Sequence, residues 1–417
     1  MENGHYGSPR VSWNRLSGGV NIFKQSVEFR DNRLVVIVAG EASGDLHGSN
    51  LVKAIREIAP DVSFIGIGGP RLEAAGVKTI VPSKDTAVVG LSEVLGKAGK
   101  IVRAYFGLKK ILRKQRPSLL ILIDYPEFNL RLAAQAKKHG IPVLYYISPQ
   151  VWAWRSGRVR KIAARVDRMV CILPFEQDFY REMGVQVDYV GHPLLDAIPG
   201  KIDTIKVRKA LGLEGHSPII GILPGSREQE IKGLLPAMIK AAEILSERFP
   251  SLGCVLPLAP TADTAWIKSA TDGAKIDIRV SQGNIYELLA ICDCAMVASG
   301  TATLEAAIMG VPMVVAYKVS PLSFFVAKRV VKVRHICLVN LVAGYEVVPE
   351  LIQEDVFPKN LADHVLDLIE DREHRENMIQ GLYRVRDRLG SGGASRRAAQ
   401  IAMGMMERSQ VSISHED

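Results

Sequence analysis

The chain has 417 residues, of which 47% are hydrophobic and 23% charged, and its formal net charge is +9. This length allows two domains with well-formed cores, and no apolar run reaches the ~20 residues that a membrane-spanning helix needs. Five cysteines without a CxxC pair argue against a disulfide framework and against a zinc site. The positive excess lies in residues 1–200, with 28 Lys and Arg against 18 Asp and Glu, whereas residues 201–417 have 25 against 26. We therefore expect the first half to bind an anionic partner, namely nucleic acid, phospholipid or a phosphorylated substrate.

Residues 1–33 are polar and mixed, and we expect a flexible N-terminal extension there. Beyond them, apolar runs rich in Val, Ile and Leu alternate with helical patterns, which indicates parallel sheets covered on both faces. These runs cover residues 33–40, 62–69, 118–124, 141–148, 168–174, 217–225, 252–259, 275–281, 292–300 and 311–318. We predict an α/β protein with two Rossmann-like, doubly wound domains that face a cleft, over residues 34–200 and 201–385. A helical tail, 386–417, is predicted to cross back onto the first domain.

The first predicted strand is followed by the loop AGEASGD (39–45), which offers Glu41, Ser43 and Asp45. The loop lacks GxGxxG and its two carboxylates would repel a pyrophosphate, so a hydroxyl-rich substrate is favoured over a dinucleotide. Asp45 could equally cap the helix that begins here. That helix is predicted to bury Leu51, Val52, Ile55 and Ile58.

Residues 86–96 (TAVVGLSEVLG) form an apolar segment bordered by glycines. The next residues, 100–116, have a helical pattern with an apolar stripe formed by Ile101, Tyr105, Leu108 and Leu112. A basic amphipathic helix beside an apolar patch is typical of proteins that rest on anionic lipid, although a solvated outer helix packed on the sheet would look similar. The charge asymmetry favours lipid. The predicted membrane contacts are Val88, Val89, Leu91, Val94, Leu95, Arg103, Lys110 and Lys114.

Asp124 comes directly after a buried strand and is therefore expected at the rim of the cleft. A carboxylate there can take the proton of a sugar hydroxyl that attacks an activated anomeric carbon. The alternative is a strand-end Asp that caps the following turn. His47 and His192 are rival bases, but each is more typical of a loop histidine that is already hydrogen-bonded.

The segment SPQVWAWRSGRVRK (148–161) interleaves two tryptophans with arginines. Such a pattern can stack on nucleic acid, lie at a lipid surface or bind an anionic sugar. Signatures of RRM, KH and helix-turn-helix modules are absent, which disfavours nucleic acid. We expect Trp152 and Trp154 to line acyl chain or sugar, with at least one indole structural, and Arg155, Arg158 and Arg160 to attract a phosphate.

Two turns in the second half are predicted to bind a nucleoside diphosphate. In ILPGSREQEIK (222–232), a strand ends in a tight turn that contains Gly225 and Ser226, and Arg227 follows where a helix begins. In SGTATLE (299–305), Ser299, Gly300 and Thr301 precede a second helix, and Glu305 lies within reach of a ribose. Helix N-termini and an arginine favour phosphate. Capped strand–helix turns without a ligand are the alternative. Neither turn is a GxxxxGK[ST] loop, so a kinase or ATPase is disfavoured.

In their order and spacing these segments resemble glycosyltransferase family 19, the lipid-A-disaccharide synthases, over roughly residues 34–380. The matching motifs are GEASGD (40–45), GIGGPRLEAAG (66–76), VVGLSEVLG (88–96), IDYPEFNLRLA (123–133), SPQVWAWRSGRVRKI (148–162), LPFE (173–176), VGHPL (190–194), LPGSREQEI (223–231) and SGTATLE (299–305). The resemblance implies a GT-B fold without a catalytic metal or cofactor. It also implies an inverting transfer of 2,3-diacylglucosamine from UDP to the 6-hydroxyl of 2,3-diacylglucosamine 1-phosphate (lipid X), which gives a β-1,6-linked disaccharide 1-phosphate and UDP.

The resemblance further implies roles for single residues. Asp124 would be the base, Arg227 would bind the diphosphate, and the turn 299–305 would hold UDP. Asn340 would join the nucleotide site, although Val339 stands where the family has a proline. The family's setting is the cytoplasmic face of the inner membrane of Gram-negative bacteria, with peripheral attachment, and a homodimer stays open.

Two other functions are compatible with parts of this pattern. Another GT-B UDP-sugar transferase or a UDP-sugar epimerase would share the turns of the second half, but it would not need the apolar segment around residues 88–95. A binder of single-stranded nucleic acid could use Trp152 and Trp154 as stacking platforms, but the anion-binding turns lie in the neutral half.

Overall fold

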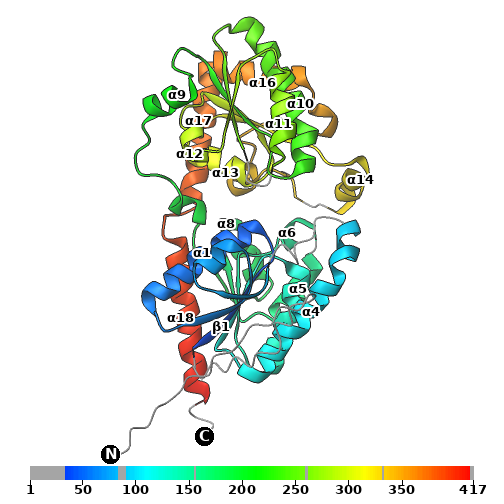
Figure 1. The fold of residues 1–417 in the computed structure, drawn as a ribbon, viewed down its shortest axis with the longest axis vertical. Coiled ribbons are helices and arrows are strands. Elements are labelled where there is room, and N and C mark those ends of the chain that lie inside the picture. Colours follow the sequence, from blue (N-terminus) through cyan, green and yellow to red (C-terminus); the bar gives the residue numbers. More distant parts are fainter. Residues whose placement is uncertain (1–32, 83–90, 155, 259–261, 331–332, 414–417) are drawn as a thin grey trace, which may run out of the picture.

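A computed structural model describes residues 33–82, 91–154, 156–258, 262–330 and 333–413. It contains two parallel β-sheets, each covered by helices and stacked along the long axis of the molecule (Figure 1). The first sheet has the strand order β3-β2-β1-β4-β5-β6-β7 and the second has β10-β9-β8-β11-β12-β13. The predicted α/β architecture with two doubly wound, Rossmann-like domains is confirmed.

The first domain follows the β-α alternation of its sequence. Its strands are β1 Leu34–Ala39, β2 Ser63–Gly68, β3 Lys78–Pro82, β4 Leu119–Ile123, β5 Val143–Tyr146, β6 Arg168–Cys171 and β7 Val187–Tyr189. Its helices are α1 Ala42–Ile58, α2 Pro70–Ala74, α4 Leu91–Gln115, α5 Pro126–Lys138, α6 Val151–Trp154, α7 Val159–Ala163 and α8 Pro174–Glu182, with 3-10 turns η2 Ser156–Arg158 and η3 Pro193–Asp196. On α1, Leu51, Val52 and Ile55 are buried as predicted, but Ile58 is exposed.

The second domain repeats the pattern. Its strands are β8 Ile219–Leu223, β9 Gly253–Pro257, β10 Ile278–Ser281, β11 Cys294–Ala298, β12 Met313–Tyr317 and β13 Glu350–Ile352. Its helices are α9 Thr204–Leu211, α10 Glu228–Arg248, α11 Thr264–Asp272, α12 Ile285–Leu289, α13 Thr301–Ile308, α14 Pro321–Val330, α15 Leu338–Ala343, α16 Pro358–Glu370 and α17 Arg372–Arg388, with the 3-10 turn η4 Gln353–Asp355.

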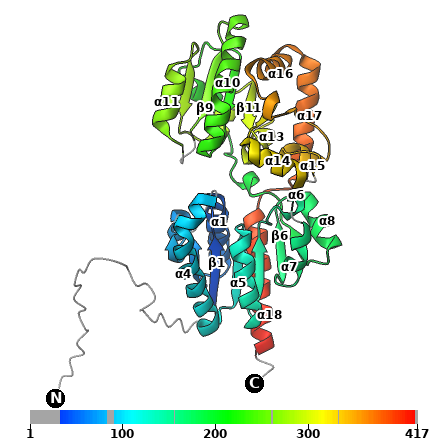
Figure 2. The same cartoon turned by 90° about the vertical axis from the view of Figure 1, so that its right-hand side faces the viewer.

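The last helix, α18 (Ala394–Ile413), leaves the second domain and lies along the first, beside α1 (Figures 1 and 2). Hydrogen bonds to backbone carbonyls fix the crossing. The His192 N–H donates to the Leu389 carbonyl at 2.9 Å, and the Arg397 guanidinium donates to the Val190 carbonyl at 2.6 Å. The predicted crossover helix is therefore confirmed. Helix α17 runs past residue 385, so the division of the chain at 200 and 385 stays a proposal.

Helix α4 packs its predicted apolar stripe on the first sheet. Leu108 and Leu112 are fully buried, whereas the charged face with Arg103, Lys110 and Lys114 is exposed. Leu91, Val94 and Leu95 lie in its first turns, but their side chains, like the whole of Val88, Val89 and nearly all of the predicted extension 1–33, are outside the described residues. Among the helices described, none combines the length and apolarity needed to cross a membrane.

Candidate active site between the two sheets

The strand order places the predicted site residues of each domain side by side. In the first sheet β1 and β4 are neighbours, with Ala39 opposite Ile123, so the loops that begin at Gly40 and Asp124 leave the same edge together. In the second sheet β8 and β11 are neighbours, with Leu223 opposite Val297, which brings together the turns at Gly225 and Gly300. Both positions are the carboxyl-end crevices where doubly wound sheets bind ligands.

The turn that carries Asp124 is strained. Asp124 and Tyr125 have φ angles of 48° and 49°, a left-handed conformation that costs roughly 1–2 kcal/mol for each residue other than glycine. The Tyr125 ring lies against Gly40, where an added Cβ would come within 2.6 Å of Tyr125 Cγ. Glycine at position 40 is therefore required for this turn, and the loop of Glu41 is held next to the Asp124 turn.

Charged groups of both domains act on the Asp124 carboxylate. Burial raises its pKa to about 6, and the negative charge of Glu41 adds to this effect. The Tyr125 backbone N–H and the positive charge of Arg227 act in the opposite direction. Glu41 belongs to the first domain and Arg227 to the second, so Asp124 faces the space between them. A carboxylate with this pKa is mostly ionised at neutral pH and can accept a proton.

The two rival histidines are poor bases. Burial lowers the pKa of His47 to about 4 and the pKa of His192 to about 3. His192 already accepts a hydrogen bond at Nδ1 from the Leu194 N–H, at 3.2 Å. Both imidazoles are therefore neutral at pH 7 and have little affinity for a proton.

Within the first loop, Glu41 is half-buried and Ser43 is exposed. Asp45 has hydrogen-bond partners outside its own loop. Its buried carboxylate accepts hydrogen bonds from the N–H groups of Gly69 (2.7 Å), Arg71 (3.0 Å) and Leu72 (3.1 Å). Asp45 therefore caps α2 and organises the turn after β2, and it does not cap its own helix, whose N-cap is Glu41. A contact of Asp45 with an acceptor stays a prediction.

Glu176 forms hydrogen bonds with side chains of the segment 148–163. This fully buried carboxylate accepts hydrogen bonds from the Ser148 hydroxyl (2.5 Å), the Trp152 indole N–H (3.0 Å) and the Leu173 N–H (3.2 Å). Trp152 also packs edge-on against Phe175. One indole is thus structural, as expected, and a contact of Trp152 with an acceptor stays a prediction.

The arginines of the same segment differ in their surroundings. Arg158 forms an ion pair with Glu127, which lies close in sequence to Asp124, and Arg160 is exposed. Arg155 and the side chain of Trp154 are outside the described residues. Through Arg158 and Arg160 the segment thus places cationic groups on the first domain, and Arg158 lies beside the helix that follows Asp124.

The first turn of the second domain has the geometry of an anion site. Gly225 has a φ of 108°, and α10 begins directly after Arg227, whose side chain is 61% exposed. The Glu230 carboxylate accepts from the N–H groups of Ser226 and Arg227 at 3.4 Å and from the Arg227 guanidinium at 3.2 Å. These long contacts leave Arg227 accessible to a stronger anion.

The second turn places a carboxylate beside the same crevice. Gly300 is the N-cap of α13, Thr301 is exposed in its first turn, and Ser299 ends the loop after β11. The half-buried Glu305 has no hydrogen-bond partner for its side chain among the described residues, and burial raises its pKa to about 7. A carboxylate kept without partners in this position can receive the hydroxyl pair of a ribose.

Asn340 is buried and bonds to the chain that follows α15. Its amide donates to the Val348 carbonyl (2.9 Å) and to Glu350 (2.7 Å), and its oxygen accepts from the N–H groups of Val347 (2.7 Å) and Val348 (3.1 Å). The buried side chain has thus used its hydrogen-bonding capacity. Asn340 fixes the chain after α15, and its place in the nucleotide site stays a prediction.

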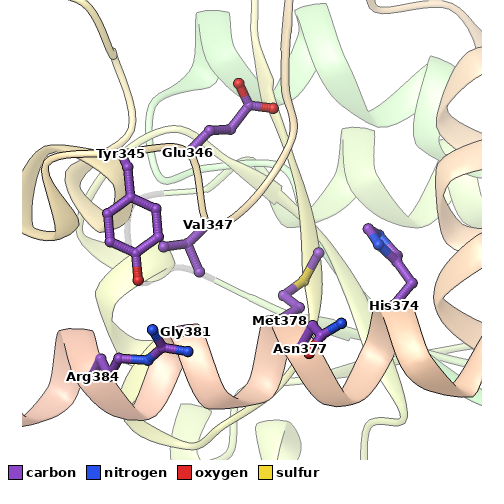
Figure 3. A pocket seen from close by; sticks show the side chains of 8 residues that line it. All are labelled: Tyr345, Glu346, Val347, His374, Asn377, Met378, Gly381 and Arg384. Atoms are coloured by element: carbon purple, nitrogen blue, oxygen red, sulfur yellow. The ribbon is translucent and has the colours of Figure 1, made fainter.

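A separate hollow of about 200 Å³ lies between α17 and the loop after α15 (Figure 3). Tyr345, Glu346 and Val347 line it from the loop, and Arg384 lines it from the helix. It shares no residue with the crevice and is smaller than the ~300–1,000 Å³ of typical ligand pockets. We therefore do not assign the site to it.

The motifs and this geometry agree with known proteins. A family model described as lipid-A-disaccharide synthetase matches residues 35–403. The chain belongs to this family. A lipid-A-disaccharide synthase of Geobacter metallireducens is 48% identical over 90% of the chain and 98% of the relative, and one of Geobacter sulfurreducens is 46% identical over 89% and 97%. The resemblance drawn from the motifs is confirmed, and so is the prediction of a glycosyltransferase of lipid A synthesis.

Solved structures confirm the GT-B fold of this lipid-A-disaccharide synthetase family member. A UDP complex of S. aureus MnaA has a TM-score of 0.60 at 14% identity, covering 88% of the chain and 94% of that protein. The calicheamicin glycosyltransferase CalG4 has a TM-score of 0.58 at 15% identity, covering 90% and 98%. At such identities the likeness concerns the fold alone.

Proposed function

We propose that the chain transfers 2,3-diacylglucosamine from its UDP carrier to the 6-hydroxyl of 2,3-diacylglucosamine 1-phosphate. The products are the β-1,6-linked disaccharide 1-phosphate and UDP. One observation carries the proposal: the carboxylate of Asp124 interacts with Glu41 on its own domain and with Arg227 on the other. A base and a diphosphate-binding cation thus face each other across the space between the domains, in a chain that belongs to the lipid-A-disaccharide synthetase family.

In this reaction the second domain holds the donor. Arg227 and the N-termini of α10 and α13 stabilise the charge that grows on the diphosphate as the bond to the anomeric carbon breaks. Glu305 accepts hydrogen bonds from the ribose. Gly225, Ser226, Ser299, Gly300 and Thr301 complete the proposed nucleotide site.

The first domain holds the acceptor and supplies the base. The 6-hydroxyl oxygen attacks the anomeric carbon from the face opposite the diphosphate, and its proton passes to Asp124. Attack from that face inverts the anomeric configuration, which yields the β linkage. Glu41 and Ser43 are proposed to contact the acceptor sugar, while Trp152, Trp154, Arg155, Arg158 and Arg160 are proposed to receive its acyl chains and 1-phosphate.

Both sugars are lipids, and the exposed face of α4 supports a contact with anionic membrane. Val102 is 53% and Phe106 60% exposed, beside the cationic Arg103 and Lys110. On the second domain, α14 exposes Phe325 (58%) next to Lys328 and Arg329. The two helices lie on the same side of the molecule, at the right in Figure 1 and toward the viewer in Figure 2. We propose peripheral attachment through this side to the cytoplasmic face of the inner membrane, and sedimentation would decide whether a homodimer forms there.

The decisive assay supplies both acylated sugars in detergent and measures UDP release together with the mass of the product. We expect a disaccharide 1-phosphate from the wild type, and a rate lowered by ~10² or more in Asp124→Ala, because a general base contributes that much. Release of UDP without a disaccharide, or an epimerised sugar from unacylated UDP-N-acetylglucosamine, would contradict the proposal in favour of another UDP-sugar enzyme.

A further inference from the structure

Two buried side chains converge on the backbone of Asp124. The Tyr145 hydroxyl, from β5, and the Asn129 side-chain amide, from α5, each donate a hydrogen bond to the Asp124 carbonyl oxygen at 2.5 Å. The same Asn129 amide also donates to the Ile123 carbonyl at 3.2 Å. Both donors are 0% exposed. A carbonyl oxygen has two lone pairs, so the two donors use its hydrogen-bonding capacity.

The bonded carbonyl lies within the strained turn. Asp124 and Tyr125 both have left-handed backbones, which residues with a Cβ rarely adopt. Such a conformation persists only where the surroundings enforce it, and strained backbones of this kind cluster at functional sites. Here the enforcing contacts come from both sides: two donors hold the carbonyl of Asp124, while Gly40 and the stacked ring of Phe128 hold the ring of Tyr125.

We propose that Tyr145 and Asn129 are positioning residues for the base. By holding the carbonyl of Asp124, they keep its backbone left-handed and thereby direct its carboxylate toward the space shared by Glu41 and Arg227. Neither side chain touches the substrate. The proposal rests on the proposed function for its kinetic consequence, but not for the geometry of the turn.

The neighbouring tyrosine provides a matched control. Tyr146 is also 0% exposed and lies on the same strand, but its side chain belongs to the core on the opposite face of the sheet. Tyr145→Phe and Tyr146→Phe remove the same hydroxyl from adjacent buried positions. The same change of buried volume occurs in both variants, whereas only Tyr145→Phe removes the hydrogen bond to the Asp124 carbonyl.

The kinetic test compares these two variants at several pH values. We expect Tyr145→Phe to lower kcat ~10-fold with KM for both sugars within about twofold, because a base misplaced by a fraction of an ångström loses much of its effect. The lower limb of its pH profile should move to lower pH, because a released carboxylate regains water and moves away from Glu41, the two causes that raise its pKa, and these outweigh the opposing charge of Arg227. Tyr146→Phe should keep the wild-type kcat and limb. A wild-type kcat and limb in Tyr145→Phe would overturn the proposal.

A second measurement separates this proposal from the proposed function. Titration of the Asp124 carboxyl by ¹³C NMR of aspartate-labelled protein, assigned with Asp124→Asn, reports the surroundings of the carboxylate without turnover. A lower pKa in Tyr145→Phe, and again in Asn129→Ala, supports the positioning role even if the wild type fails to join the acylated sugars. An unchanged titration in both folded variants refutes it, even if the glycosyl transfer is confirmed.

Discussion

Asp124 is the proposed base, and a carboxylate accepts a proton only while it is deprotonated, so its pKa should set the acid limb of the pH profile. Burial and the charge of Glu41 raise that pKa to about 6. The kcat/KM of the wild type should therefore increase with pH up to about 6 and level off above it. Glu41→Gln removes one cause of the raised pKa and should move the limb to lower pH. A profile that is flat from pH 5 to 7 would exclude Asp124 as the base.

Arg227 is predicted to bind the diphosphate through its exposed guanidinium. Arg227→Ala should weaken UDP binding ~10-fold or more in calorimetry, because charge-assisted hydrogen bonds to phosphate are among the stronger polar contacts. Arg181→Ala is the matched control, since Arg181 is equally exposed and pairs with Asp178 at the same i,i+3 spacing, but on the first domain. Equal UDP affinities of the two variants would remove Arg227 from the nucleotide site.

At the scale of elements, the sequence predicts the strands that are buried on both faces of a sheet, because such strands form continuous apolar runs. Nine of the ten predicted apolar runs correspond to largely buried strands, and the tenth corresponds to β10, a partly exposed strand at the edge of the second sheet. The strands that it misses, β3, β7 and β13, are short, lie at sheet edges and are partly exposed, so their sequences lack a continuous apolar run.

The sequence predicts which turns carry the candidate site residues, but it does not predict the hydrogen-bond partners of their side chains. Asp124, Arg227 and Glu305 follow from their places after strands. The sequence does not show that Asp45 and Asn340 accept hydrogen bonds from backbone N–H groups of other loops, because these partners are brought to them only by the fold. The hydrogen bond of Tyr145 could not be predicted, because Tyr145 lies within an apolar run and the sequence does not show what its buried hydroxyl contacts. The LPFE motif did contain a signal for Glu176, because a glutamate at the third position of a helix is typical of a capping box.

Glu176 makes the stability of the segment 148–163 depend on pH. Burial raises its pKa to about 7, against the opposing hydrogen bonds from Ser148, Leu173 and Trp152. A carboxyl group with a raised pKa stabilises the fold fully below its unfolded pKa, about 4.5, and this contribution is lost as pH increases through about 7. Glu176→Gln should therefore flatten the decline in unfolding free energy between pH 5 and 8, by on the order of 3 kcal/mol.

Denaturant unfolding of this variant and of Glu182→Gln tests the point, since Glu182 is exposed at the end of the same helix. The prediction is wrong if both variants show the wild-type pH dependence. The order of the segment that carries Ser148 and Trp152 therefore depends on one buried carboxylate, because both side chains bind it.

At the scale of the whole molecule, the two domains are joined where the chain crosses twice. Gly191 and Gly390, both with positive φ, lie against each other, and an added Cβ on Gly191 would lie 2.9 Å from the Arg397 guanidinium. The two chain segments that cross here therefore approach each other more closely than side chains at these positions would allow. Because α18 then lies along α1, helices from the first and the last parts of the described chain pack together in the first domain, and the second sheet lies between them in the sequence (Figure 1).

This arrangement leaves α4 and α14 on one side of the molecule, and we expect the two helices to bind a membrane together. Val102→Ser with Phe106→Ser should reduce sedimentation of the protein with phosphatidylglycerol vesicles several-fold, because each exposed apolar side chain that enters lipid contributes on the order of 1–2 kcal/mol. Phe325→Ser should reduce it further if both domains contact one surface. Ile205→Ser is the control, since Ile205 is 77% exposed on α9, and it should bind like the wild type. Added salt should weaken binding in all of them, because Arg103, Lys110, Lys328 and Arg329 attract the anionic headgroups. Equal binding of all four proteins would show that this side does not meet the membrane.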